Sequence, residues 1–307
     1  MFDIYKSQVA LLLRMLPFIA EEDTFALKGG TAINLFVQDF PRLSVDIDLL
    51  YLPFSDRDVA LQEITKALRT LKAKIESKFR DLRVEAVSQQ EGNDAKLLCI
   101  ASKEIQVKIE VNTVMRGHLF EPRMLSCVDK VVDEFEAFAQ IKVASHGELY
   151  GGKICAALDR QHPRDLFDIY YLLKTGGITE DVKIGFIAGL LSHPRPIHEV
   201  LGPNFIDQRE VYESKFFGMA FEPFSYEQFE ETRQHLSEEI KRAFTDDDKK
   251  FLLSFKSGEP DLSLIKTPRF QDLPAVKWKL INLRTLIKNN PQKHHEQYEA
   301  LREKLGE

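Results

Sequence analysis

Two aspartates in a short alternating segment have the spacing of metal ligands. In SVDIDLLYLP (44–53), apolar residues alternate with Asp46 and Asp48, and a period of two is that of a β-strand, so both carboxylates lie on one face. Neighbouring carboxylates repel each other unless cations neutralise them. Mg²⁺ (or Mn²⁺) with oxygen ligands is a common way to do so. The pattern predicts that Asp46 and Asp48 bind a divalent metal, although an exposed strand face is the alternative.

A glycine pair precedes this segment. Gly29 and Gly30 follow the apolar stretch FALK (25–28) and precede a predicted helix, TAINLFVQDF (31–40). Backbone N–H groups at a helix N-terminus are suited to bind phosphate. Two metal ions beside a bound triphosphate would activate an attacking oxygen and neutralise a leaving pyrophosphate. A glycine pair alone is usually only a turn, but its place before the aspartate strand favours a nucleotide-binding site.

A third carboxylate comes from a later segment. IQVKIEVNTV (105–114) also has strand periodicity, with Lys108 and Glu110 on one face. If this strand lies beside 44–53, Glu110 joins Asp46 and Asp48 in one cleft. A salt-bridged surface residue is the alternative for Glu110.

Four more charged residues have matched spacing on two predicted helices: Lys153 and Arg160 on 146–161, and Asp165 and Asp168 on 163–177. Each pair shares a helix face. A turn at 161–162 would fold the helices together, so that Lys153 and Arg160 meet phosphate while an aspartate holds the lysine. A helix hairpin stabilised by Arg–Asp pairs is the alternative.

The elements around these residues predict two regions. Residues 1–115 have the order helix, helix, strand, helix and three strands, which indicates an α/β (α+β) fold with a small mixed, mostly antiparallel sheet flanked by helices. From residue 146 the periodicity is mainly helical, including 225–244, 274–289 and 291–305. We expect an α/β domain over 1–145 and a helical domain over 146–307 that contributes Lys153 and Asp165/Asp168 to the cleft.

Composition excludes several classes of protein. The 307 residues include 42 basic and 48 acidic side chains, a net charge of −6, and 44% are hydrophobic. This balance fits a globular protein and argues against disorder or nucleic-acid binding through bulk charge. No apolar stretch is long enough for a membrane span, and no secretory signal pattern begins the chain. The three cysteines form no CxxC pair, so we expect free thiols and a cytoplasmic location.

The charge is uneven along the chain. Residues 196–261 hold 8 basic and 15 acidic side chains, whereas residues 262–307 hold 9 basic and 5 acidic ones. The basic C-terminal stretch is a candidate to contact RNA phosphates. A solvated basic helix face is the alternative.

These motifs together resemble a known family. KGGTA (28–32), the R-x-S-x-DIDL segment (42–49) and GGKICAALDRQHPRDLFDIYYL (151–172) are similar to the AbiEii/AbiGii toxins, which belong to the DNA polymerase β-like nucleotidyltransferase superfamily. The resemblance covers about residues 25–175. It implies a bacterial toxin–antitoxin or abortive-infection toxin that transfers a nucleoside monophosphate from an NTP. The acceptor would be RNA, such as a tRNA 3′ end, or a protein hydroxyl, and a cognate antitoxin is an expected partner.

The resemblance also implies roles for single residues. The triphosphate would be held by Gly29, Gly30 and Thr31, with Arg42, Ser44, Arg164 and Asp165 as further nucleotide-binding candidates. The metal would be held by Asp46 and Asp48. Lys153 matches the motif lysine that meets phosphate, and Asp168, or its neighbour Asp165, matches the final motif aspartate. Glu110 is assigned by strand pattern alone and would help to deprotonate the acceptor.

Two other functions fit parts of this pattern. A sugar-nucleotide transferase also uses a DxD, but the Gly-Gly-Thr before the helix argues against it. A non-catalytic protein that senses nucleotides or docks an antitoxin needs no complete carboxylate set, and this chain has all the motif carboxylates.

Overall fold

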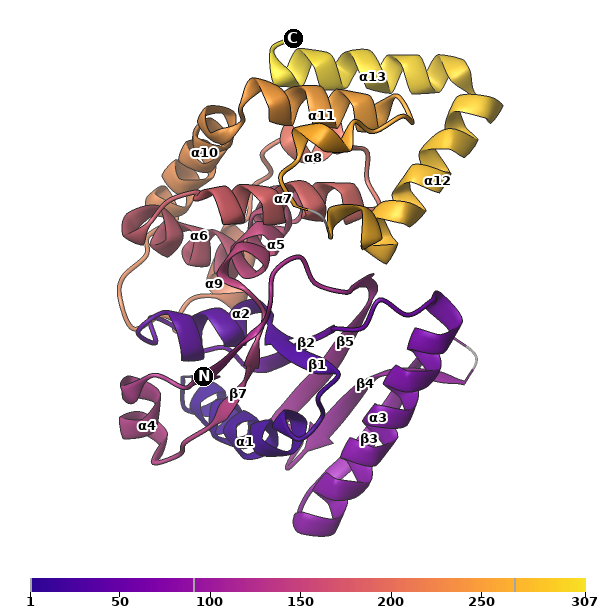
Figure 1. Ribbon diagram of the computed structural model, residues 1–307. Coiled ribbons are helices and arrows are strands. Elements are labelled where there is room, and N and C mark those ends of the chain that lie inside the picture. The colour runs from indigo at the N-terminus through magenta and orange to yellow at the C-terminus, as the bar shows by residue number, and fades with distance from the viewer. Residues whose placement is uncertain (1, 91, 268) are drawn as a thin grey trace. The chain divides into compact units, whose positions relative to one another are not determined.

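A computed structural model describes residues 2–90, 92–267 and 269–307 (Figure 1). The chain forms two compact units. The first comprises Met1–Ser145 with Phe216–Pro223, and the second comprises His146–Lys215 with Phe224–Glu307. The first unit is therefore discontinuous in sequence.

The first unit is built on a seven-stranded sheet. Its strands are β1 (Phe25–Lys28), β2 (Asp46–Tyr51), β3 (Arg83–Gln90), β4 (Asn93–Ile100), β5 (Gln106–Arg116), β6 (Arg123–Ser126) and β7 (Gln140–Val143). The order across the sheet is β3-β4-β5-β2-β1-β7-β6. The pairs β2–β5 and β1–β7 are parallel, and the other four are antiparallel. The predicted mixed, mostly antiparallel sheet is thus confirmed.

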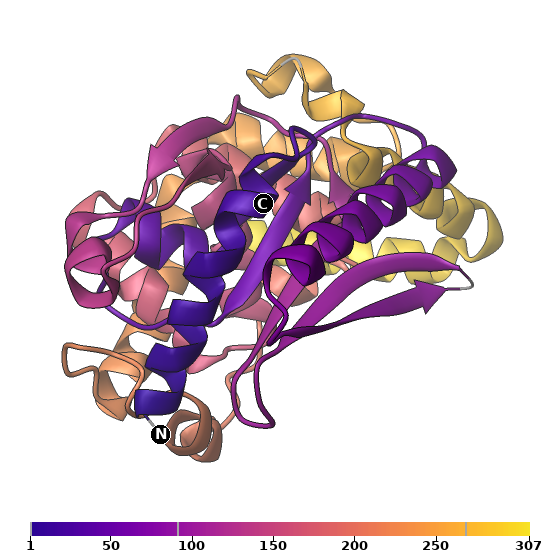
Figure 2. The ribbon, with the colours of Figure 1, turned by 90° about the horizontal axis from the view of Figure 1, so that it is seen from below.

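Two long helices, α1 (Phe2–Ala20) and α3 (Arg57–Lys78), cover one face of this sheet (Figure 2). The alternation in the strands explains this arrangement, because one face of β2 and β5 is apolar and fully buried, at Ile47, Leu49, Val107, Ile109 and Val111. Burying such side chains contributes roughly 1.5–3 kcal/mol each. The alternate residues of the same strands lie on the opposite face, which is polar.

The helix after the glycine pair differs from the prediction. Instead of 31–40, it comprises α2 (Gly29–Ala32) and a π-helical stretch, Ile33–Val37. The backbone becomes extended at Gln38, and Phe40 has a positive φ of 54°, so the helix cannot continue to Pro41.

A further short helix, α4 (Asp129–Phe135), precedes β7.

The second unit is helical. It contains α5 (His146–Asp159), α6 (Pro163–Thr175), α7 (Glu180–Ser192), α8 (Ile197–Leu201), α9 (Arg209–Lys215), α10 (Tyr226–Ala243), α11 (Asp246–Lys256), α12 (Pro274–Asn289) and α13 (Pro291–Leu305), with short 3₁₀ turns at Leu262–Leu264 and Phe270–Asp272. Proline occupies the first turn of α6, α12 and α13, where its missing N–H costs nothing. In the described part of the chain, none of the helices has the length and apolar character needed to cross a membrane.

Helices α5 and α7 approach each other closely through glycines. A Cβ at Gly151 would lie 2.2 Å from the backbone carbon of Gly185, and one at Gly185 would lie 2.1 Å from the carbonyl oxygen of Gly147. The neighbouring Gly152 has no atom within 4 Å of such a Cβ. Gly151 therefore permits the close packing of α5 against α7, whereas Gly152 takes no part in it.

This contrast gives a paired prediction. We expect Gly151→Ala to lower the free energy of unfolding by about 1–3 kcal/mol, because the clash is with backbone and no rotamer change relieves it. Gly152→Ala should instead raise it by up to ~1 kcal/mol, the usual gain of alanine over glycine in a helix. Denaturant melts followed by circular dichroism measure both. Equal stability of the two variants would show that the close approach of α5 to α7 does not matter.

Candidate active site

The polar face of the sheet collects the predicted carboxylates in the first unit. Because β2 and β5 are parallel neighbours, Asp48 lies opposite Glu110, and Asp46 lies opposite Lys108. On the other side of β2, Asp48 lies opposite Lys28 of β1. Side chains in register point to the same face, so acidic and basic groups alternate across three strands.

Glu110 is held by two lysines. Its carboxylate oxygens lie 2.9 Å from Lys96 Nζ and 2.8 Å from Lys108 Nζ. Burial favours the neutral acid, but the hydrogen bonds from both lysines outweigh it and lower the pKa of Glu110. Burial also disfavours the charge of Lys108, yet Glu110, Asp46 and Asp48 together raise the pKa of this lysine. The third carboxylate is thus ionised and paired, as the alternative interpretation of Glu110 describes.

Gly29 places backbone directly against Asp48. It has a positive φ of 71°, which favours glycine, and a Cβ at this position would lie 2.4 Å from Asp48 Oδ2. A Cβ at Gly30 would lie 2.8 Å from Arg42 Nη2 and 3.0 Å from Ser44 Oγ. Both glycines are therefore required by close approach, one beside the metal candidate and the other beside Arg42.

Buried hydrogen bonds join the glycine helix to β2. The Thr31 hydroxyl donates to the carbonyl oxygen of Asp46 and lies 3.0 Å from Ser44 Oγ. Arg42 is 2% exposed and donates to the carbonyl oxygen of Leu43 at 2.9 Å. The side chains of Thr31, Arg42 and Ser44 are all buried, so they hold the glycine turn in place beside Asp46 and Asp48.

The segment Phe216–Pro223 completes this part of the unit. Leu43 N–H donates to the carbonyl oxygen of Met219, Phe221 N–H donates to that of Pro41, and Arg42 and Ala220 form an antiparallel bridge. The phenyl rings of Phe40 and Phe221 lie 4.9 Å apart. The loop with Arg42 is therefore fixed by residues far along the chain, which sequence spacing gave no means to predict.

The donor set fits a divalent cation that is shared with substrate. Within residues 2–90, 92–267 and 269–307, no three His, Cys, Asp or Glu side chains are grouped to hold a metal by themselves. Mg²⁺ is usually bound by one or two carboxylates, with water and substrate phosphates as the remaining ligands. Asp46 and Asp48 supply such a pair, and the absence of a side chain at Gly29 makes room for the Asp48 carboxylate.

The second unit contains the other predicted residues. Lys153 Nζ lies 2.9 Å from both Asp165 Oδ1 and Asp168 Oδ2, and all three side chains are buried. Arg160 contacts Asp165 with two nitrogens, at 2.6 and 3.0 Å. Burial favours the neutral acid, but Lys153 and Arg160 outweigh it and hold the pKa of Asp165 well below its usual range. The ammonium of Lys153 is therefore neutralised by two carboxylates.

The buried side chain of Gln161 fixes the turn between α5 and α6, a role that the sequence pattern did not indicate. Gln161 has a positive φ of 50° and is buried. Its side-chain oxygen accepts from Arg233 Nη1 at 2.7 Å, and its nitrogen donates to the carbonyl oxygen of Asn204 at 2.8 Å. His162 Nδ1 accepts from the N–H of Arg164 and caps α6. Arg233 lies 72 residues from Gln161, so local periodicity could not reveal this support.

Comparison with solved structures identifies the fold. The fold is similar to that of MenT4, a nucleotidyltransferase toxin from Mycobacterium tuberculosis H37Rv, with a TM-score of 0.63 and 12% sequence identity. The match covers 92% of this chain and 93% of that chain. At this identity the likeness establishes that the two chains share a fold.

The sequence then identifies the family. Residues 10–281 match the family described as "Nucleotidyl transferase AbiEii toxin, Type IV TA system". The chain belongs to this family of nucleotidyltransferase toxins of type IV toxin–antitoxin systems. No curated protein sequence matches it.

Proposed function

We propose that the protein transfers a nucleoside monophosphate from an NTP to a hydroxyl of RNA, such as a tRNA 3′ end, in a metal-dependent reaction. The observation that carries this proposal is the polar face of β2, where Asp46 and Asp48 lie side by side and Gly29 brings backbone against Asp48. Membership of the AbiEii family supports the reaction class. The attack of the hydroxyl on the α-phosphate would release pyrophosphate.

Each group of residues has a proposed part. Asp46 and Asp48 would hold Mg²⁺ or Mn²⁺, which neutralises the developing negative charge on the phosphates. Backbone N–H groups of the glycine helix would bind the triphosphate, and Arg42 and Ser44 would keep Gly30 in position. Lys153, with Asp165 and Asp168, supports the α5–α6 hairpin and its Arg164. We retain the assignment of Glu110 as the third carboxylate as a prediction.

A labelled-nucleotide assay tests the proposal. Purified protein is incubated with total RNA and each α-³²P-labelled NTP, with Mg²⁺ present or chelated. We expect label in RNA for at least one NTP, only with the metal, together with release of pyrophosphate. Label on protein in RNase-treated samples would assign a protein acceptor instead. Transfer from UDP-sugars, or no transfer to any acceptor, would contradict nucleotidyl transfer.

A further inference from the structure

We propose that the exposed face of α12 binds a single-stranded segment of the RNA acceptor, with a base stacked on Trp278 and phosphates on the cations beside it. Helix α12 lies within the second unit (Figure 1), and its exposed face includes Lys277, Trp278, Ile281, Arg284 and Lys288. This inference rests on the proposed function, because it names where that acceptor is held. It also narrows the basic C-terminal stretch predicted from the sequence to one side of one helix.

The sequence of α12 is basic and contains no acid to offset it. Its 16 residues include four basic side chains and no aspartate or glutamate. Helix α13, in contrast, holds three basic and three acidic side chains. Glu259 lines a pocket together with Lys277 and Arg284, yet residues 259–295 as a whole hold seven basic against three acidic side chains. The positive charge of the C-terminal stretch is therefore concentrated around α12.

Three cations form a row along the exposed face. Lys277, Arg284 and Lys288 are separated by seven and then four residues, so they share one side of the helix over roughly 16 Å. Within the part of the chain that the structure describes, only Lys277 of these three forms an ion pair, at 3.9 Å from Asp272, and both partners are more than half exposed. Such a pair is weak. Arg284 Nε donates to the carbonyl oxygen of Gly258 at 3.0 Å, which leaves its charge uncompensated.

An exposed aromatic ring lies beside this row. Trp278 is 62% exposed, and Ile281, one turn further along the helix, is 54% exposed. A positively charged surface with exposed aromatic rings is the arrangement by which proteins hold single-stranded nucleic acid, because every base can stack on a ring. The face therefore offers a surface for a base next to cations for the phosphates on either side of it.

The opposite side of α12 is fixed to the rest of the second unit. Val276 and Leu283 are buried. Lys279 Nζ donates to the carbonyl oxygens of His193 and Arg195, at 2.6 and 2.7 Å. The helix is thus held in one orientation with its cation row outward, which reduces the entropy lost on binding.

Other occupants match this face less completely. A second copy docked through the same face would bring the two cation rows together, and like charges repel. An acidic protein segment would match the cations but would not need a flat ring beside them. RNA matches both features, because each nucleotide carries a phosphate and a flat base.

The fluorescence of Trp278 tests the stacking, since the chain has one tryptophan. We expect a 20-nucleotide single-stranded RNA to quench it as binding proceeds, and a duplex of the same length to quench it far less, because its bases are already stacked. In anisotropy measurements with 5′-fluorescein-labelled RNA, Trp278→Ala should weaken binding about tenfold and Trp278→Phe less, since phenylalanine keeps a ring. The melting temperatures should stay unchanged because the side chain is exposed.

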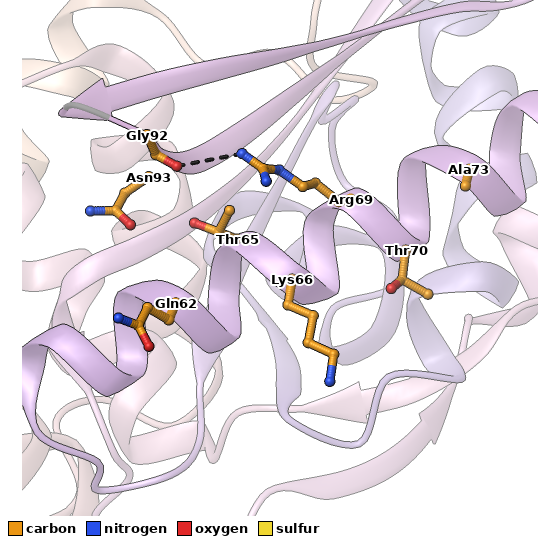
Figure 3. A pocket seen from close by; sticks show the side chains of 8 residues that line it. All are labelled: Gln62, Thr65, Lys66, Arg69, Thr70, Ala73, Gly92 and Asn93. Carbon is orange, nitrogen blue, oxygen red and sulfur yellow. Dashed lines mark hydrogen bonds between the residues drawn. The ribbon is translucent and has the colours of Figure 1, made fainter.

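Salt dependence tests the contribution of the cations. For Lys288→Gln, the slope of log K against log[salt] should fall by about 0.7, the value for one phosphate contact on a single strand. The loss should be the same for RNAs of different sequence. Lys66→Gln is the matched control and should leave the affinity unchanged. Lys66 is an exposed lysine of α3 in the first unit, and none of the side chains labelled around it in Figure 3 is aromatic.

Four results would overturn the inference. Unquenched tryptophan fluorescence at saturating RNA would place the RNA elsewhere. Equal weakening by Lys66→Gln and Lys288→Gln would indicate attraction by overall charge alone. Polyglutamate that quenches Trp278 and binds as tightly as RNA would assign the face to an acidic protein segment. A wild-type dimer that Trp278→Ala dissociates in ultracentrifugation would assign it to a second copy. If wild-type protein labels RNA but the α12 variants bind RNA normally, the proposed function stands and only the role of α12 is wrong.

Discussion

Replacing Asp48 with asparagine should reduce nucleotide transfer at least about a hundredfold, which corresponds to ~2.7 kcal/mol of transition-state stabilisation. The same result is expected for Asp46→Asn. Asparagine keeps the shape of each side chain but removes the charge that binds a divalent cation. Because both residues are partly exposed on the polar face, the fold should tolerate the change. Initial rates with labelled NTP measure the loss.

A second readout separates a metal-binding role from other causes. Titration of Mn²⁺, followed by electron paramagnetic resonance, should show weaker binding to both variants, while their melting temperatures stay within a few degrees of wild type. Asp58→Asn is the control, since Asp58 is exposed in the first turn of α3. Full transfer activity in the Asp46 or Asp48 variant would contradict the assignment of these residues as metal ligands.

The same assay with Glu110→Gln tests whether Glu110 is the third carboxylate of the reaction. If Glu110 acts on the substrate or metal, Glu110→Gln should lower the rate of nucleotide transfer as much as Asp48→Asn does. If it serves only to pair Lys96 and Lys108, the rate should fall far less. The two outcomes differ by more than tenfold, so one comparison distinguishes them.

Replacing Lys153 with methionine should destabilise the protein by about 3–5 kcal/mol, because it leaves two buried carboxylates without their shared cation. For a chain of this size that corresponds to a fall in melting temperature of about 6–20 °C. Arg160→Gln is the matched control. Arg160 contacts the same Asp165 but is 61% exposed, and exposed ion pairs contribute about 1 kcal/mol at most.

The loss of stability caused by Lys153→Met should also depend on pH. Because the pKa of Asp165 is lower in the folded chain than in the unfolded one, its charge stabilises the fold above about pH 3.9, and this contribution fades as pH falls through the folded value. Without Lys153, burial instead favours the protonated carboxyls. The gap in melting temperature between wild type and Lys153→Met should therefore be widest at neutral pH and narrow towards pH 4. An unchanged melting temperature with lost transfer would mean that Lys153 serves the substrate and not the fold.

Local patterns were enough to predict the elements that carry the candidate site. The alternation around Asp46 and Asp48 predicted β2, and Pro163 with Gly176 predicted the bounds of α6 to within two residues. Pro274 and Pro291 begin α12 and α13 as expected. These elements were predictable because short-range sterics and capping fix them.

Helices and strands whose sequences lack a distinctive periodicity were not predicted. Helix α7 is buried on nearly all sides, so its sequence has no polar face to show a helical period. Strands β6 and β7 have four residues each, too few to establish alternation. Strand periodicity allowed Glu110 to be placed beside the aspartate strand, and the register of β2 and β5 agrees with this. The hydrogen bond between Gln161 and Arg233 joins residues 72 apart in the sequence, and only the tertiary fold determines it.

The discontinuous first unit has a consequence for synthesis of the protein. Leu43 leaves the ribosome roughly 175 residues before Met219, the partner that completes its hydrogen bonding. At about 5–20 residues per second, the loop that carries Arg42 waits some 9–35 s for that partner. A nascent or truncated chain that ends before residue 216 lacks the segment that braces the glycine turn, so the toxin should become active only once most of its length has been translated.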